Sequence, residues 1–257
     1  MRRLLLAYLR FLLRSTNQHG IHSPFVYELV NQCFKDRKPY PEYAQLKAYR
    51  ESVRRDNTVL EITDLGPGSH ILKSKQRAVK DIAKNAGSTA RRTQLLFRLV
   101  RHFKAQNILE LGTSLGIASH AMSLGNPEAR IKTIEGCPNL SAYTRDQLSG
   151  QAAKYVNILT GDFDEVLDNL EPEKYDLIFI DGNHQKESTV GYFKRMKDLV
   201  HNDSVIIFDD INWSKGMQEA WAEIMADKCV RVSIDTFFWG LVFFRKEQAK
   251  EHFNIRL

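Results

Sequence analysis

The feature that most constrains the fold is an alternation of short apolar runs and longer helical stretches that begins at residue 107. The runs lie at 107–111, 130–135, 155–160, 175–181, 204–210, 230–235 and 239–245. Alternating strands and helices form a parallel sheet with helices on both faces, because parallel neighbours need a crossover connection. The last two runs are too close for a crossover helix, so we expect an antiparallel hairpin. The sequence therefore predicts an α/β fold with a seven-stranded, mostly parallel sheet.

Composition places the chain among ordinary folded proteins. It has 257 residues, of which 43% are hydrophobic and 26% are charged, so it can bury a large core without metal or disulfide staples. Cys33, Cys137 and Cys229 form no C-x-x-C pair, which argues against a zinc finger and against a disulfide framework. Disordered tails and disulfide scaffolds are excluded, and we expect a protein of the reducing cytoplasm.

The first fourteen residues, MRRLLLAYLRFLLR, look like a secretion signal but do not have its pattern. Arg10 and Arg14 interrupt the apolar run, and it is far shorter than the ~20 residues needed to span a bilayer. As a helix, this segment has Arg3, Arg10 and Arg14 on one face and apolar residues on the rest. We expect that surface to be covered by the same domain or by a second subunit in a homodimer. A peripheral membrane helix is the alternative.

Charge is distributed unevenly along the chain. Residues 1–106 have 21 Lys+Arg against 8 Asp+Glu, a net charge of +13, whereas residues 107–257 have 16 against 23, a net charge of −7. The basic half suits nucleic acid, an anionic membrane or an acidic substrate, or it complements the acidic half of the same chain.

We expect two parts with different roles: a basic, mainly helical extension or lid at 1–87 and the main α/β domain at 88–257. Within the extension, Asp64, Gly66 and Gly68 resemble the start of a nucleotide-binding turn. The segment that follows is polar and basic, with no second strand ending in an acid at the expected distance. We therefore interpret this loop as a turn or an active-site lid.

The ends of the first three runs predict a binding site for adenosine. Ligands of open α/β sheets bind beyond the carboxyl ends of the strands. The first run leads into E-x-G-x-x-x-G, with Glu110, Gly112 and Gly116, and glycine allows a ligand to approach the backbone. Glu135 ends the second run, where a carboxylate can accept bonds from both ribose hydroxyls. Asp162 follows the third run, where it can accept a bond from an adenine amino group.

The glycine spacing indicates a cofactor without phosphate, since dinucleotide sites favour G-x-G-x-x-G before a helix N-terminus. At these motifs the sequence resembles the class I S-adenosylmethionine-dependent methyltransferases, and among them the catechol and caffeoyl-coenzyme A types. The resemblance covers about residues 88–245 and implies a Rossmann-like sheet. It also implies cofactor contacts, which fall here on Glu110, Gly112, Thr113, Gly116, Glu135 and Asp162.

The resemblance further implies a divalent metal site. The positions of the metal ligands are occupied here by Asp181 in FIDGNH and by Asp209 and Asp210 in FDDIN. Three converging carboxylates favour a hard cation such as Mg²⁺. Two residues depart from the pattern: Asp210 replaces an Asn ligand, and His184 replaces a catalytic Lys. We expect His184 and Asp181 to act in catalysis, with His184 as the base that removes an acceptor proton.

Simpler interpretations stay open. Asp181 and Asp209 are also suitable helix-capping acids, and His184 is also suitable for a hydrogen bond at a helix start. The function favoured is O-methylation of a small hydroxylated, catechol-like acceptor with metal assistance. The alternatives are an RNA methyltransferase that uses the basic half, although no N/D-P-P-Y/F pattern follows the fourth strand, and a cofactor-binding protein without catalysis.

Overall fold

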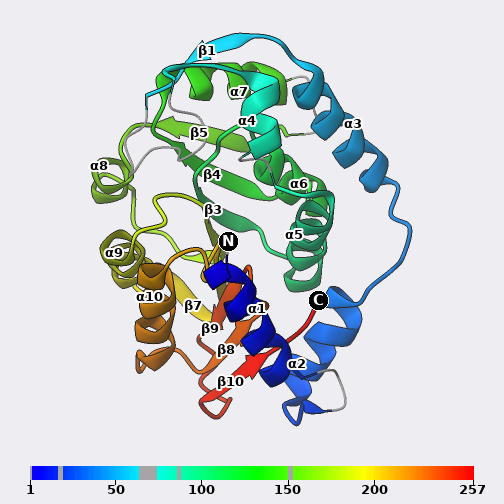
Figure 1. Cartoon of the computed structure of the whole chain (residues 1–257), viewed down its shortest axis with the longest axis vertical. Helices are drawn as coiled ribbons and strands as arrows, with labels where there is room; N and C mark the ends of the chain where they lie inside the picture. Colours follow the sequence, from blue (N-terminus) through cyan, green and yellow to red (C-terminus); the bar gives the residue numbers. More distant parts are fainter. Residues whose placement is uncertain (1, 17–19, 64–73, 86–87, 150–152) are drawn as a thin grey trace. The chain divides into compact units, whose positions relative to one another are not determined.

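The computed structural model describes residues 2–16, 20–63, 74–85, 88–149 and 153–257 (Figure 1). The chain divides into two compact units, Arg37–Glu171 and a unit that combines Met1–Asp36 with Pro172–Leu257. The functional division at residues 87 and 88 stays a prediction, and the Asp64–Gly68 loop lies outside the described residues.

The Arg37–Glu171 unit has alternating helices and strands. In chain order these are α3 (Glu42–Arg55), β1 (Val59–Glu61), β2 (Gln76–Ala78), α4 (Val79–Asn85), α5 (Ala90–Phe103), β3 (Asn107–Leu111), α6 (Ile117–Gly125), β4 (Arg130–Glu135), α7 (Pro138–Ser149), β5 (Val156–Thr160) and α8 (Phe163–Asp168). Strands β3, β4 and β5 pair in parallel in that order. Strands β1 and β2 form a separate antiparallel pair.

Local sequence accounts for these elements. Four consecutive residues of β3, from Ile108 to Leu111, are buried, and β3 and β4 have the predicted bounds. Helix α5 begins after Thr89, whose hydroxyl accepts a bond from Arg92 N, as expected for a capping Thr. Its apolar positions face inward, and Leu96, Leu99 and Val100 are fully buried.

The second unit contains the remaining elements. These are α1 (Arg2–Arg14), α2 (Pro24–Leu29), a π-helical turn (Val30–Phe34), β6 (Tyr175–Ile180), α9 (Lys186–Met196), β7 (Val200–Phe208), α10 (Lys215–Ala226), β8 (Val232–Asp235), β9 (Gly240–Phe243) and β10 (Glu251–Asn254). The strand order within this unit is β10-β8-β9-β7-β6. Strand β7 runs parallel to β6 and antiparallel to β9.

The terminal hairpin is confirmed. Strands β8 and β9 pair antiparallel from Val232↔Phe243 to Asp235↔Gly240. All seven predicted strands are present, which confirms the mostly parallel α/β fold. Strand β10 was not predicted: it adds to the edge beside β8, in parallel register, and none of its residues is buried. An exposed edge strand lacks the apolar pattern that identifies a buried one.

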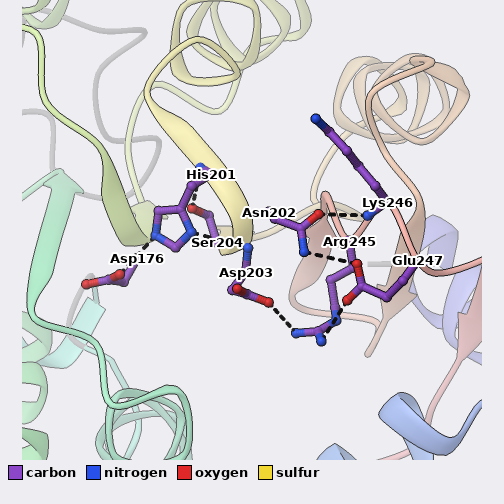
Figure 2. A network of polar contacts seen from close by, with 8 residues as sticks. All are labelled: Asp176, His201, Asn202, Asp203, Ser204, Arg245, Lys246 and Glu247. Atoms are coloured by element: carbon purple, nitrogen blue, oxygen red, sulfur yellow. Dashed lines mark hydrogen bonds and ion pairs between the residues drawn. The ribbon is translucent and has the colours of Figure 1, made fainter.

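Strand β7 starts earlier than its apolar run because a polar bulge lies near its beginning. The register with β6 moves from Tyr175↔Val200 to Leu177↔Val205, so β7 contains extra residues there. Figure 2 shows the side chains that hold this bulge. His201 Nε2 lies 2.9 Å from Asp176 Oδ1, and the ring atom His201 Nδ1 accepts from Asp203 N at 3.2 Å. Both ring nitrogens are thus engaged in structural contacts.

Arg245 completes this network from the segment after β9 (Figure 2). Its guanidinium lies 2.7 Å from Asp203 Oδ1 and 2.7 Å from Glu247 Oε1. Asn202 donates to Glu247 and accepts from Lys246 N. Because these groups lie at the start of β7, they are at the end of the strand opposite to the predicted site, and we assign them a structural role.

Helix α1 is an amphipathic helix of 13 residues. Within the described residues, no helix is long and apolar enough to cross a membrane. Phe11 is buried, and Tyr8 and Phe11 contact Phe237 in the connection between β8 and β9. The helix therefore packs on its own unit, which is one of the arrangements expected from the sequence. Only part of its surface is covered in this way.

Candidate functional site

The glycine turn after β3 comprises residues 112–116. At two of its positions the backbone has a conformation that only glycine adopts readily. Gly112 has φ of 103° and Gly116 has φ of 67°. The amides of Gly112 and Thr113 donate to Ile134 O of the neighbouring strand β4, at 3.0 and 3.2 Å. A Cβ on Gly116 would lie 2.7 Å from Thr144 Cγ2. Packing against α7 is thus a second reason for glycine here, besides the approach of a ligand.

Glu135 is held in place at the end of β4 by two backbone amides. Its Oε2 accepts from Ser114 N at 2.8 Å, and its Oε1 accepts from Cys137 N at 2.9 Å. The carboxylate therefore joins the glycine turn after β3 to the start of α7. These two bonds fix the orientation of the carboxylate, which has about four acceptor positions in all.

Glu110 is fully buried beneath the turn. Burial raises its pKa to about 7, although hydrogen bonds from Ser119 and Thr133 oppose the rise. Ser119 Oγ donates to Oε2, whereas Oε1 has no hydrogen-bond partner within the described residues. Thr113 is also buried, and its hydroxyl shares a 2.6 Å hydrogen bond with Thr133. Both predicted site residues are thus buried inside the unit, and their contacts with a cofactor stay a prediction.

Asp162 caps helix α8. Its Oδ1 accepts from Asp164 N at 2.9 Å and from Glu165 N at 3.5 Å. The preceding Gly161 donates its amide to Glu135 O at 3.0 Å, which ties the turn after β5 to the end of β4. The capping role is observed, and the predicted contact with adenine stays a prediction.

These residues lie at one edge of the three-stranded sheet, since β3, β4 and β5 are parallel neighbours and each turn follows its strand. The edge presents a fixed carboxylate at Glu135, a second acid at Asp162 and a left-handed turn at Gly116. This arrangement of acceptors and bare backbone suits a ribose and a base.

Sequence reasoning missed one contributor to this edge, Tyr49 of α3. Its hydroxyl donates to Leu115 O in the glycine turn at 2.8 Å, and its ring lies 4.7 Å from that of His120. Burial holds the pKa of Tyr49 well above its usual range. The only sequence signal is the helical spacing of Leu46, Tyr49 and Val53, all buried, which indicates a packed face without showing what it packs against.

In the second unit, Asp181 and His184 follow β6. His184 Nε2 lies 3.7 Å from Asp181 Oδ1, longer than a hydrogen bond but within range of an ion pair with a protonated ring. The loop between them is fixed by Asn183, which has φ of 48° and donates to Ser188 Oγ at 3.0 Å and to Tyr192 Oη at 3.1 Å. His184 and Asp181 are partly exposed, at 28% and 21% of their side chains.

Asp209 and Asp210 follow β7, the parallel neighbour of β6. Asp209 is 5% exposed, and its Oδ1 accepts from Asp210 N at 2.8 Å. Asp210 has a left-handed backbone with φ of 52°, and its carbonyl accepts from Trp213 N at 2.8 Å. Trp213 itself is 51% exposed, whereas Trp239, Phe243 and Phe244 are core residues.

Among the residues that the structure describes, no three His, Cys, Asp or Glu side chains are grouped so as to hold a metal ion. Asp181, Asp209 and Asp210 follow neighbouring strands but are not grouped in this way. The metal site stays a prediction, and no chemical step is derived from it.

Comparison with known proteins decides the type of domain. Residues 109–211 match a family model described as a methyltransferase domain. These residues form a methyltransferase domain. The match contains the glycine turn, Glu135, Asp162, Asp181 and Asp209.

Solved structures with the same fold include methyltransferases with bound cofactor. The S-adenosylhomocysteine-bound methyltransferase PaMTH1 of Podospora anserina is 19% identical, with 88% of this chain and 98% of that one covered and a TM-score of 0.63. The O-methyltransferase TomG of Streptomyces achromogenes, in complex with S-adenosylmethionine, is 18% identical, with coverage of 90% and 99% and a TM-score of 0.58. An O-methyltransferase of Bacillus cereus is 19% identical, with coverage of 85% and 97% and a TM-score of 0.54.

A curated relative, the uncharacterized protein y4gI of Sinorhizobium fredii, is 25% identical over 171 residues. The aligned part is 59% of this chain and 18% of that protein. The comparisons confirm the resemblance to class I S-adenosylmethionine-dependent methyltransferases, at the level of domain type and fold.

Proposed function

We propose that the methyltransferase domain binds S-adenosylmethionine and transfers its methyl group to a hydroxyl oxygen of a small, catechol-like acceptor. One observation carries the proposal: the Glu135 carboxylate is fixed by Ser114 N and Cys137 N beside a left-handed glycine turn. That arrangement preorganises an acceptor for the two ribose hydroxyls.

The other cofactor contacts follow from the same edge. Gly112 and Gly116 would line the methionine part of the cofactor with bare backbone, while Asp162 would accept from the adenine amino group at Oδ2, because Oδ1 caps α8. Glu110 and Thr113 would act as positioning residues, since both are buried under the turn.

Proton removal from the acceptor would fall to His184. In this step His184 takes the hydroxyl proton, the oxygen attacks the sulfonium methyl carbon, and the carbon–sulfur bond breaks to leave S-adenosylhomocysteine. Asp181, 3.7 Å from His184 Nε2, would stabilise the imidazolium that forms. A divalent ion on Asp181, Asp209 and Asp210 would acidify the hydroxyl when bound, but the described residues give it no three-ligand site.

Calorimetric titration with S-adenosylmethionine tests the cofactor site. We expect Glu135→Gln to weaken binding at least tenfold, because an amide presents one acceptor oxygen where the carboxylate presents two. The matched control is Glu128→Gln, an exposed residue of the same unit, which should bind like the wild type. Equal affinity for the Glu135→Gln variant would contradict the proposed site.

Turnover with catechol, with and without Mg²⁺, tests the chemistry. His184→Ala should lose methyl transfer and keep its affinity for the cofactor, whereas His22→Ala, at an exposed position, should keep both. Full turnover in His184→Ala would remove that residue from the mechanism. Methyl transfer to RNA instead of catechol, or cofactor binding without any acceptor, would replace the proposed function with one of the two alternatives.

A further inference from the structure

One face of α1 is apolar and exposed. Its members are Leu5, Leu6, Leu9 and Leu13, with exposures of 60%, 55%, 48% and 88%, and we refer to them as the leucine face. Leu5, Leu9 and Leu13 follow one another at four-residue spacing, so they form a continuous row along the helix. The opposite side, through Phe11, is the one that packs on the unit. Four large exposed leucines on one short helix are more than scattered apolar surface residues, and they indicate a docking surface.

Arginines border the leucine face. Arg10 and Arg14 are exposed and lie four residues apart in the row that continues from Leu6. The first acidic residue of the sequence is Glu28, so α1 contains no negative side chain. The helix thus combines an apolar row with a purely cationic flank, which suits a partner that is apolar beneath and anionic at its surface.

Exposed aromatic rings lie beside the packed side of α1. Tyr8, 38% exposed, contacts Phe237 with ring centroids 4.8 Å apart, and Phe237 contacts Phe238, 46% exposed, at 5.0 Å. Asn212 donates to Phe237 O at 2.8 Å, and Trp213, which follows it, is 51% exposed. Of these, Tyr8 and Trp213 have amphipathic rings, which are favoured at the boundary between lipid and water.

We propose that α1 is an in-plane membrane helix, whose leucine face inserts into an anionic phospholipid surface while Arg10 and Arg14 contact the headgroups. The helix has 13 residues, about 20 Å at 1.5 Å per residue, too short to span an apolar layer of about 30 Å. A second copy of this chain fits less well. In a two-fold interface the same patch meets itself, so arginines would approach arginines with no acidic residue on α1 to compensate.

Flotation of the whole protein with vesicles tests the proposal. The vesicles are pure phosphatidylcholine, or phosphatidylcholine with 30% phosphatidylglycerol. We expect binding to the anionic vesicles at least tenfold tighter than to the neutral ones, and weaker in 0.5 M salt because screening acts on the headgroup contacts. Bound protein should also show a blue shift of the Trp213 emission, since the other two tryptophans, Trp221 and Trp239, are buried already.

Two matched pairs of variants separate apolar from charged contributions. The triple variant Leu5→Gln, Leu9→Gln, Leu13→Gln should lose vesicle binding at least tenfold. Its control changes three other exposed apolar residues, Tyr27, Val59 and Leu257, to Gln and should bind normally. The second pair removes positive charges. The double variant Arg10→Gln, Arg14→Gln should lose the preference for anionic vesicles, whereas its control on α3, Lys47→Gln, Arg55→Gln, should keep that preference.

Sedimentation velocity distinguishes a membrane from a second copy of this chain as the partner of the leucine face. Equal flotation of the leucine variant and the wild type, or no flotation of the wild type, overturns the proposal. A wild-type dimer that the leucine variant converts to a monomer, without any vesicle binding, would assign the leucine face to a second copy. Each outcome is independent of cofactor binding and of turnover, so it leaves the proposed function untouched.

Discussion

Replacing Gly116 by Ala should destabilise the Arg37–Glu171 unit through two separable effects. The first is backbone strain, because Gly116 has φ of 67°, a left-handed conformation that costs an L-residue about 1–2 kcal/mol. The second is steric, because the added Cβ would lie 2.7 Å from Thr144 Cγ2 and 3.1 Å from Leu148 Cδ1. Inserting a methyl into packed surroundings costs about 1–3 kcal/mol.

The two effects together predict a loss of about 2–5 kcal/mol in the free energy of unfolding. At about 2–4 °C per kcal/mol for a chain of this size, a mid-range loss lowers Tm by roughly 10 °C. Gly191→Ala is the matched control, since a Cβ there meets nothing within 4 Å and the residue lies in helix α9. We expect that control to stabilise the protein by about 0.5–1 kcal/mol.

Urea unfolding of a double-mutant cycle isolates the steric part. Thr144→Ser removes Cγ2 and retains a hydroxyl for the 2.7 Å bond to Ser114 O. The Gly116→Ala, Thr144→Ser double variant should recover about 1 kcal/mol or more of the loss relative to additive behaviour. A Gly116→Ala protein within about 0.5 kcal/mol of the wild type would refute both parts of the reasoning. An additive cycle would refute the steric part alone.

Three further predictions concern buried or capping groups. Burial raises the pKa of Glu110 from 4.5 to about 7, so the folded state holds a proton that the unfolded state releases. The stabilisation is complete below pH 4.5 and is lost as pH rises through 7. From pH 5 to 8, urea unfolding should show a stability loss of up to about 3 kcal/mol in the wild type that Glu110→Gln lacks; parallel curves would contradict it. Burial lowers the pKa of His120 from 6.5 to about 4, so its contribution to stability is complete above pH 6.5 and is lost as pH falls toward 4. In an acid titration followed by circular dichroism, His120→Leu should therefore lose less stability than the wild type. Asp162→Ala should cost about 1 kcal/mol by removing the cap of α8, whereas Asp162→Asn should cost less, and equal thermal shifts for the two would argue against capping.

Elements whose residues are buried on both faces were predictable from the sequence. Strand β3 has the predicted bounds because a parallel strand covered on both sides reads as an apolar run. Strand β4 also has the predicted bounds, although only Ile131, Thr133 and Ile134 of its residues are buried. The antiparallel pairing of β8 and β9 followed from the short connection between them, which leaves no room for a crossover. Thr89 was predictable as a cap because its role is local.

Elements defined by non-local partners were not predictable. Strand β10 has an exposed, polar sequence and exists because β8 offers it an edge. The early start of β7 depends on His201 and Arg245, which come from different segments. Tyr49 reaches the glycine turn from 66 residues away, a relation that no helical spacing contains.

The chemistry of the site divides in the same way. The sequence alone determined which strand ends carry acids and glycines, because strand periodicity and the rule that ligands bind at carboxyl ends are local and topological. Only the tertiary structure decided that Glu135 is fixed by two amides, that Glu110 is buried, and that the leucine face of α1 stays exposed. Burial and hydrogen-bond partners depend on which distant segments meet, and a pattern of residue types does not specify that.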